Sequence, residues 1–324
     1  MLTRTRSTPK RPFLPLLRDP PLKRAAWLAA GYCGWVLAWR LLVLSFVTYV
    51  VMSSGTQSPR FEDVTEALSA NELWLTALGS LLFLGLVRLF NPLPDPANPL
   101  STRSLTRPAI RKDLLPGLAQ GGILATGIVA ACLLSGVYHY LGFFVHFEQV
   151  LLAAANVLLR VASLVVLVHC DERIFRQGIL LSLRDLRLPG NPSVLVTRMA
   201  AAALTTAAFV GIKALQFDLG TMHYVTLALI SIALSLRALS GRGPLEGAGL
   251  WTALLLVFHP LFGLPVLGNE FAGIILIKYQ ATDSGPTDLM RFLTGGAGGP
   301  LSGFALQILL IFDMIRTGLR LQRN

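Results

Sequence analysis

The chain has 324 residues, of which 53% are hydrophobic and only 14% are charged, and its formal net charge at pH 7 is +11. The mean hydropathy of +0.62 and the long apolar runs exclude a soluble globular domain and predict an all-α, polytopic bundle of transmembrane helices with about eight spans. The positive charge lies mostly between the apolar runs, and no basic stripe is interleaved with aromatic residues, so we expect no nucleic-acid partner.

The chain begins with a basic, proline-interrupted arm over residues 1–24, and the apolar run after it is too long for the core of a signal peptide. Each later apolar run is near the length that crosses about 30 Å of hydrocarbon. The predicted spans are about 25–52, 73–90, 114–138, 149–184, 197–216, 222–239, 248–262 and 301–316. The 149–184 run fits either one long helix or two helices.

Loop charge predicts the orientation of these spans, because segments rich in lysine and arginine stay in the cytoplasm. The loop 53–72 is acidic and is expected outside, whereas the segment 91–113 and the tail 317–324 are basic and are expected inside. Eight spans with both termini in the cytoplasm satisfy this pattern. The further apolar piece 264–279 is either a ninth span or a re-entrant segment, and the re-entrant alternative keeps the basic tail inside.

The most informative feature is the run Asp-Glu-Arg-Ile-Phe-Arg, Asp171 to Arg176, inside an apolar stretch. Each ionisable side chain near the centre of a membrane helix costs roughly 2.5–3.5 kcal/mol, so such groups are kept where they are paired or lie in a wet cavity. Glu172 and Arg176 are four residues apart and can pair on one helix face. The cluster indicates either intramembrane carboxylate chemistry or a structural ion pair between helices, and the residues alone favour neither.

Two later predicted helices carry the further candidate polar residues Lys213 and His259, and His169 lies three residues before Glu172. The histidines have no HExxH or paired spacing and the three cysteines have no CxxC pair, so no metal site is expected. The glycine-rich string 294–300 lacks the Lys-Ser/Thr of a phosphate-binding loop, which favours a flexible or tightly turned connection.

Three motifs on successive predicted helices resemble the CPBP family, which includes CAAX prenyl endopeptidases and bacteriocin-processing enzymes. The family pattern is EExxxR, then FxxxH, then HxxxN or HxxxD. The chain has Asp171-Glu172-x-x-x-Arg176, Phe209-x-x-x-Lys213 and His259-x-x-x-Gly263 in this order. The resemblance covers roughly residues 150–315. It divides the chain into the basic arm 1–24, N-terminal transmembrane helices 25–148, a CPBP-like transmembrane core 149–316 and the tail 317–324.

The resemblance implies a membrane-embedded endopeptidase that uses no cofactor and acts on a peptide or membrane-protein substrate, in the plasma (inner) membrane of a bacterium. Glu172 would activate water, Asp171 would occupy the first acidic position, and Arg176 would be the motif arginine. His259 would help to stabilise the oxyanion, a role that needs a preorganised donor.

Two positions depart from the family pattern. Lys213 replaces the second-motif histidine, where an ammonium close to Glu172 would pair with it, and Gly263 replaces the third-motif asparagine. Loss of one oxyanion donor typically lowers the rate by about 10²–10³. The alternative function is therefore a catalytically impaired member that acts as a membrane scaffold or immunity-type binding protein. The sequence leaves the oligomeric state open.

Overall fold

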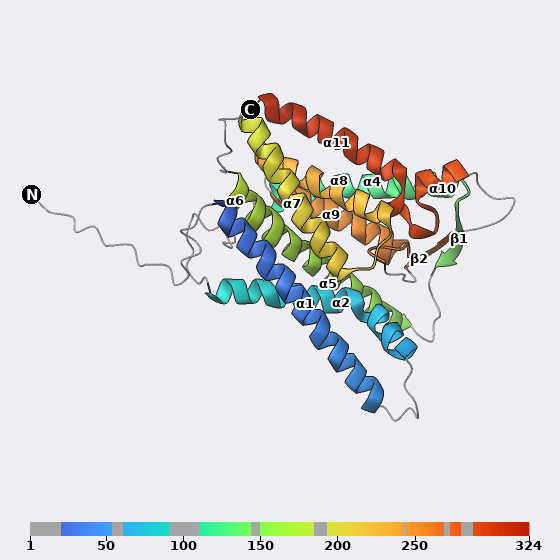
Figure 1. Ribbon diagram of the computed structural model, residues 1–324. Coiled ribbons are helices and arrows are strands. Elements are labelled where there is room, and N and C mark those ends of the chain that lie inside the picture. The colour runs from blue at the N-terminus through green and yellow to red at the C-terminus, as the bar shows by residue number, and fades with distance from the viewer. Residues whose placement is uncertain are drawn as a thin grey trace, which may run out of the picture.

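A computed structural model of the protein describes residues 21–53, 61–90, 110–143, 150–184, 193–242, 244–268, 273–279 and 288–323. These residues form one helical bundle with a small two-stranded sheet at one end (Figure 1). The longer helices are α1 (Pro21–Ser53), α2 (Phe61–Phe90), α4 (Leu115–Leu134), α5 (Val150–Asp171), α7 (Val194–Gln216), α8 (Thr221–Arg237), α9 (Pro244–Leu256) and α11 (Phe304–Arg323).

Short π-helical segments extend several of these helices. They are η3 (Ile110–Leu114) before α4, η5 (Glu172–Leu180) with α6 (Leu181–Leu183) after α5, η6 (Ala238–Arg242) after α8, and η7 (Val257–Leu261) after α9. The short helix α10 (Asp288–Thr294) and the 3₁₀ turns η8 (Gly296–Gly298) and η9 (Pro300–Ser302) lead into α11. The predicted 149–184 run therefore contains one continuous helix over residues 150–183.

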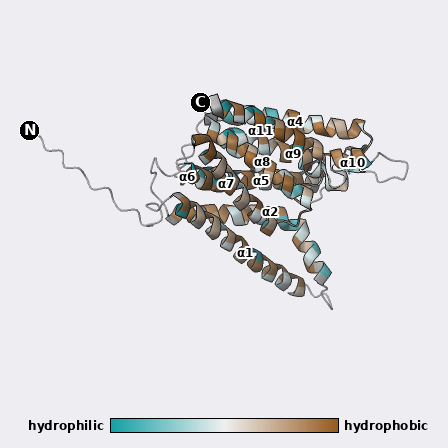
Figure 2. Ribbon diagram, turned by 45° about the horizontal axis from the view of Figure 1, so that its top comes forward, coloured by the Kyte–Doolittle hydropathy of each residue, from teal (hydrophilic) through white to brown (hydrophobic). Residues whose placement is uncertain are grey.

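Six helices in the described part of the chain are long and apolar enough to cross a membrane. They are Leu22–Ser53, Val64–Leu89, Lys112–Leu134, Ala153–Leu183, Val194–Gln216 and Thr221–Ser240. The expectation of an all-α membrane bundle is confirmed at this level. Hydrophobic residues run along most of α1, while hydrophilic residues gather toward the C-terminal end of α11 (Figure 2).

The structure corrects two predictions, one for the loop 53–72 and one for the segment 264–279. Residues 61–72 belong to α2 rather than to a loop. The segment 264–279 forms no ninth helical span in its described residues, because its last part is strand β2 (Ile275–Tyr279). This strand pairs antiparallel with β1 (Tyr138–Phe143), which follows α4 where the sequence predicted the end of a span.

Glycines bring α4 and α9 into close contact. A Cβ atom on Gly117 would meet the carbonyl of Glu246, one on Gly121 would meet the carbonyl of Leu250, and one on Gly249 would meet the carbonyl of Leu114. Helices in lipid gain little from apolar burial, so close backbone packing over small residues is a main source of their association. The Gly117-x-x-x-Gly121 spacing therefore fixes α9 against α4.

The remaining helices surround α5 and its π-helical continuation. α2 packs along α5, and η5 contacts α1, α7, α8 and α9. α1 and α2 lie on one side of the bundle and α11 on the opposite side (Figures 1 and 2). The acidic motif of η5 is thereby placed in the interior of the bundle.

Candidate functional site

The acidic motif lies where α5 changes into the π-helix η5, and every residue from Asp171 to Leu180 is buried. A π-helical segment is uncommon and occurs frequently at functional sites, because the extra residue per turn redirects side chains. At this transition Asp171 and Glu172 have different partners, because adjacent residues of a helix point about 100° apart.

Two ion pairs neutralise the cluster. Arg176 Nε lies 3.6 Å from Glu172 Oε1, one turn away on the same helix. Lys213 Nζ of α7 lies 2.9 Å from Asp171 Oδ2, with both side chains almost fully buried. The lysine thus contacts the first acid of the motif, whereas we expected it to pair with Glu172.

Phe209, the aromatic residue of the second motif, contacts both cations through its ring. The guanidinium of Arg176 lies 4.7 Å from the centre of its ring, and Lys213 Nζ lies 5.6 Å from the same centre. Desolvated cations gain from such contacts with an aromatic face. The Phe209-x-x-x-Lys213 spacing therefore puts both side chains against the acidic motif from one helix.

A chain of hydrogen bonds continues from Lys213 to the N-terminal helices. Lys213 Nζ donates to Gln216 Oε1 at 2.9 Å, and Gln216 Nε2 donates to the hydroxyl of Tyr32 on α1 at 3.0 Å. The Tyr32 hydroxyl is 2.7 Å from Ser80 Oγ on α2. Tyr32, Ser80 and Gln216 were not predicted as site residues, so the site extends beyond the expected core 149–316 into the helices 25–148.

Of the two carboxylates, Glu172 has the longer ion-pair contact, 3.6 Å against 2.9 Å for Asp171. It is 3% exposed, and neither carboxylate oxygen accepts a hydrogen bond from any residue that the structure describes. Its contact with Arg176 is longer than a charge-assisted hydrogen bond, which measures about 2.7–2.9 Å. Buried polar groups in proteins are nearly always hydrogen-bonded, so each exception calls for an explanation, such as a ligand, a proton or a reacting water.

His259 lies at another level of the bundle. Its Nδ1 atom is 3.3 Å from the carbonyl of Leu264, and Arg160 is close enough for its charge to act on the imidazole. Arg160 precedes Glu172 by twelve residues on one helix, an axial distance of about 18 Å. α9 contacts η5, whereas η7, which follows α9, contacts α5. The α9–η7 segment therefore runs antiparallel to the α5–η5 segment, and His259 of η7 lies away from Glu172.

His169 does not extend the cluster either, because its charged neighbours are Arg88 and Arg173. Arg173, a residue of the motif that the sequence did not single out, donates to Gln177 Oε1 at 2.7 Å. The described residues hold no group of three or more histidine, cysteine or acidic side chains with metal-binding geometry.

A second polar network, centred on the buried Arg237, joins α4, α8, α9 and α11. Arg237 of α8 donates to both carboxylate oxygens of Asp313 on α11, at 2.6 and 2.9 Å. It also donates to Glu246 of α9 at 3.0 Å and to Gln120 of α4 at 3.1 Å. This network was not predicted from the sequence, although acidic residues at 246 and 313 beside apolar runs were a visible signal.

The glycine-rich string is tightly turned rather than open. Gly295, Gly296 and Gly299 have positive φ angles, and Ser302 Oγ donates to the carbonyls of Gly295 and Gly299. The hydroxyl of Tyr138 donates to the carbonyl of Gly296, which attaches β1 to the turn. These hydrogen bonds stabilise the turn and attach it to β1, which is a structural role for the string.

Comparisons of the chain with family models, with curated proteins and with solved structures find no match. The resemblance to the CPBP family rests on the three motifs.

Proposed function

We propose that the protein is a CPBP-like membrane endopeptidase in which Glu172 activates the attacking water. The observation that carries this proposal is the environment of Glu172, a buried carboxylate with no described hydrogen-bond donor and one distant cation. A carboxylate removed from water is a stronger base than one in solution, and it needs only a positioned water to act.

In the proposed reaction, Glu172 accepts a proton from water while the water oxygen bonds to the peptide carbonyl carbon. The carboxylic acid then returns this proton to the amine as the C–N bond breaks, so that one water is consumed for each peptide bond. Arg176 orients the carboxylate, and the Asp171–Lys213 pair supplies a neutral, rigid wall beside it. His259 is given no part in this step, because its neighbours are Leu264 and Arg160.

The arrangement of the sheet supports eight crossings with both termini in the cytoplasm. β1 follows α4 and pairs with β2, which follows η7, so α9 and η7 return the chain to the side that α4 reached. α9 has 13 residues and η7 has 5, so the two together are about 27 Å long at the rise per residue of an α-helix. α11 then leads back from the His223 end of α8 to its Arg237 end. We place this bundle in the inner membrane of a bacterium.

A second candidate function is a binding protein without hydrolysis. The observation in its favour is that Lys213 pairs with Asp171 and that His259 lies elsewhere, so two of the expected catalytic positions do not meet Glu172. In this case the cluster stabilises the bundle, and the protein holds a peptide or membrane protein without cutting it.

The experiment compares membranes that contain the wild-type protein, Glu172→Gln or the control Glu66→Gln. Glutamine keeps the volume of Glu172 but cannot accept the proton, whereas Glu66 is exposed on α2. New N-termini of membrane proteins are identified by mass spectrometry. We expect cleavage sites that depend on the wild type, persist in Glu66→Gln and vanish in Glu172→Gln.

Cleavage that survives Glu172→Gln would exclude Glu172 as the base. A complete lack of wild-type-dependent cleavage, together with a membrane protein that copurifies equally with wild type and Glu172→Gln, would favour the binding function. Size-exclusion profiles in detergent control for loss of folded protein.

A further inference from the structure

The end of the bundle that carries the small sheet exposes apolar side chains. Figure 1 shows β1, β2 and α10 together at this end, and α6 and the C-terminus at the opposite end. Tyr140 and Phe143 of β1 are 54% and 66% exposed, and Leu289 and Phe292 of α10 are 63% and 44% exposed. Apolar side chains that gather on an exposed surface commonly mark a contact with a membrane or with another protein. Neither the proposed hydrolysis nor the CPBP motifs use these residues.

A β-bulge brings the two aromatic rings of β1 onto one face. Residues three apart on a regular strand point to opposite faces. The pairing of β1 with β2 shifts between Tyr140 and Gly142, so Leu141 is an extra residue, and Gly142 has a positive φ angle of 139°. The rings of Tyr140 and Phe143 consequently meet edge to face, with their centres 5.9 Å apart. A tyrosine beside a phenylalanine presents an apolar surface with one polar tip, which suits the boundary between lipid and water.

α10 has an apolar face and a charged face. Leu289 and Phe292 are three residues apart and are neighbours on the helix surface. Asp288 and Arg291 have the same spacing, and their charged groups lie 3.7 Å apart. The ring of Phe292 packs against Phe304 at the start of α11, with the ring centres 5.0 Å apart, which attaches this face of α10 to the bundle. A helix of this composition can lie along a membrane surface with its apolar face toward lipid.

Chain connections and hydrogen bonds hold this end at the boundary of the bilayer. Leu134 is the last residue of an apolar helix of span length, and Tyr138 follows four residues later, at most about 14 Å away. The Tyr138 hydroxyl donates to the carbonyl of Gly296, and His223 Nε2 lies 3.0 Å from the carbonyl of Gly298. His223 belongs to the first turn of α8, a second helix of span length. The sheet and the turn that follows α10 are therefore attached to the ends of two spans, where hydrocarbon meets the head groups.

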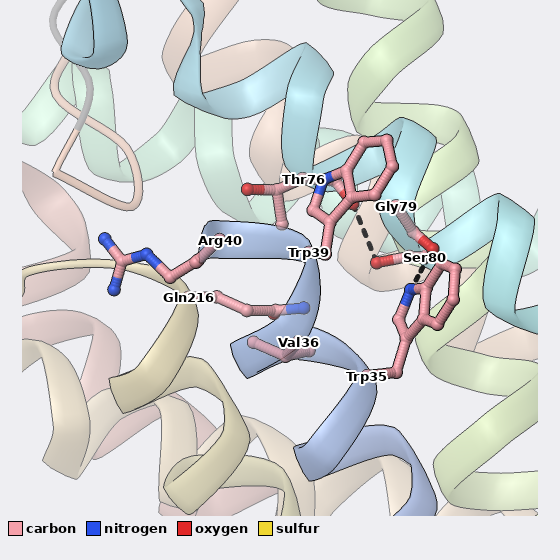
Figure 3. A pocket seen from close by; sticks show the side chains of 8 residues that line it. All are labelled: Trp35, Val36, Trp39, Arg40, Thr76, Gly79, Ser80 and Gln216. Carbon is pink, nitrogen blue, oxygen red and sulfur yellow. Dashed lines mark hydrogen bonds between the residues drawn. The ribbon is translucent and has the colours of Figure 1, made fainter. Parts of the chain in front are cut away.

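The tryptophans of α1 have a different environment from these exposed rings. Trp35 Nε1 donates to the carbonyl of Gly79 at 2.8 Å, and Trp39 Nε1 donates to the carbonyl of Leu75 at 3.0 Å. Figure 3 shows both indoles pointing toward α2. Both are half-buried, so they pack between two helices, whereas the rings of β1 are exposed.

We propose that β1 and α10 form an interfacial surface that inserts Tyr140, Phe143 and Leu289 into the adjoining leaflet. The partner is the lipid surface itself. The three side chains enter the region between head groups and acyl chains, while Asp288 stays in water. With the orientation proposed above, this is the outer leaflet. Removal of apolar surface from water drives the insertion, so it depends neither on lipid charge nor on hydrolysis by the protein.

The test uses the full chain reconstituted in phosphatidylcholine vesicles with or without phosphatidylglycerol. Spin labels are attached to single cysteines, introduced as Tyr140→Cys, Phe143→Cys or Leu289→Cys in a chain whose native cysteines are replaced by alanine. Asp288→Cys is the matched control, because the side chain of Asp288 is fully exposed. Collisions of each label with oxygen, which concentrates in lipid, are compared with collisions with a water-soluble nickel chelate. We expect oxygen to dominate at the three apolar positions and the chelate to dominate at position 288, equally in both kinds of vesicle.

Access of the chelate to the β1 labels or to the α10 label that equals its access to position 288 would overturn the proposal. Labels shielded from both reagents would also overturn it, because they would indicate that protein covers the surface. Lipid contact only in vesicles with phosphatidylglycerol would overturn the apolar mechanism in favour of electrostatic adhesion.

A second measurement needs no substitution. The unmodified protein in vesicles is photolabelled with a lipid-soluble diazirine, and the labelled peptides are identified by mass spectrometry. We expect labelled residues within 138–143 and 288–294, and the absence of label from both segments would overturn the proposal. The cleavage assay of Glu172→Gln is independent of these measurements, so the two proposals can fail separately.

Discussion

Asp171 and Glu172 are neighbours in the chain, yet they have different partners and are suited to different tasks. Asp171 has a direct contact with Lys213, a residue held in turn by Gln216. Glu172 has one long contact with Arg176 on its own helix. The carboxylate with the longer ion-pair contact is the one that remains available to react, which is why we propose Glu172 as the base.

The Asp171–Lys213 pair makes a prediction about stability. Lys213→Met leaves Asp171 buried without its cation, and breaking a buried pair in this way typically costs about 3–5 kcal/mol. The double variant Asp171→Asn/Lys213→Met removes both charges and should recover most of this loss. Thermal unfolding in detergent measures both variants. Equal destabilisation by the single and the double variant would show that the pair contributes little.

Lys213→His restores the family residue at the same position. Because histidine can still donate a hydrogen bond to Asp171, or pair with it when protonated, we expect the variant to fold and to maintain or raise cleavage in the assay of membrane N-termini. Loss of all cleavage in a folded Lys213→His variant would indicate that the ammonium itself is required.

At the scale of elements, the contact between α4 and α9 depends on which face of α4 each glycine occupies. Gly121 faces α9, where an added Cβ would also lie 2.9 Å from the Cβ of Ala253 and 3.0 Å from Leu250 Cα. A Cβ atom added to Gly122 would meet nothing within 4 Å among the described residues. The close contact with α9 therefore requires a glycine at position 121 but not at position 122.

Substitution by alanine should separate these two roles. Gly121→Ala forces the helices apart and should destabilise the bundle by about 1–3 kcal/mol, the usual cost of overpacking. Gly122→Ala should be neutral or stabilising by up to about 1 kcal/mol, because alanine is the better helix former. Thermal unfolding of the two variants in the same detergent checks the prediction. Similar effects would mean that the close approach of α4 to α9 is not needed.

At the scale of the whole molecule, the number of crossings depends on α9 and α11, which are shorter or more charged than the six helices that satisfy length and apolarity. Six and eight crossings place Asn324 on the same side, so a reporter at the C-terminus does not distinguish them. A reporter at Ser284, between β2 and α10, does distinguish them.

For eight crossings we expect reporters at Gln57 and Ser284 on the outside and a reporter at Asn324 in the cytoplasm, following the arginine and lysine distribution. Accessibility of cysteines at these positions to a membrane-impermeant reagent provides the measurement. A cytoplasmic Ser284 would instead favour six crossings.

The long apolar runs alone determined that the protein is a helical membrane protein and where six of its helices lie. An apolar segment that is long enough to cross a membrane is stable in few other environments. The spacing of Glu172 and Arg176 likewise predicted their contact, since residues four apart on one helix are neighbours. A ninth span at 264–279, one of the two alternatives, is wrong, because hydrophobicity alone does not distinguish a strand that pairs with β1 from a helix.

Only the tertiary structure decided which distant residues meet. The partner of Lys213 depends on how α7 packs against α5 and η5, and the separation of His259 from Glu172 depends on the antiparallel packing of α9 against α5. Helices far apart in the chain bring Tyr32 and Ser80 to the candidate site. The network around Arg237 likewise joins helices that are distant in the sequence. Periodicity within a helix constrains its own faces, but the pairing of faces between helices is set by packing, which no local pattern contains.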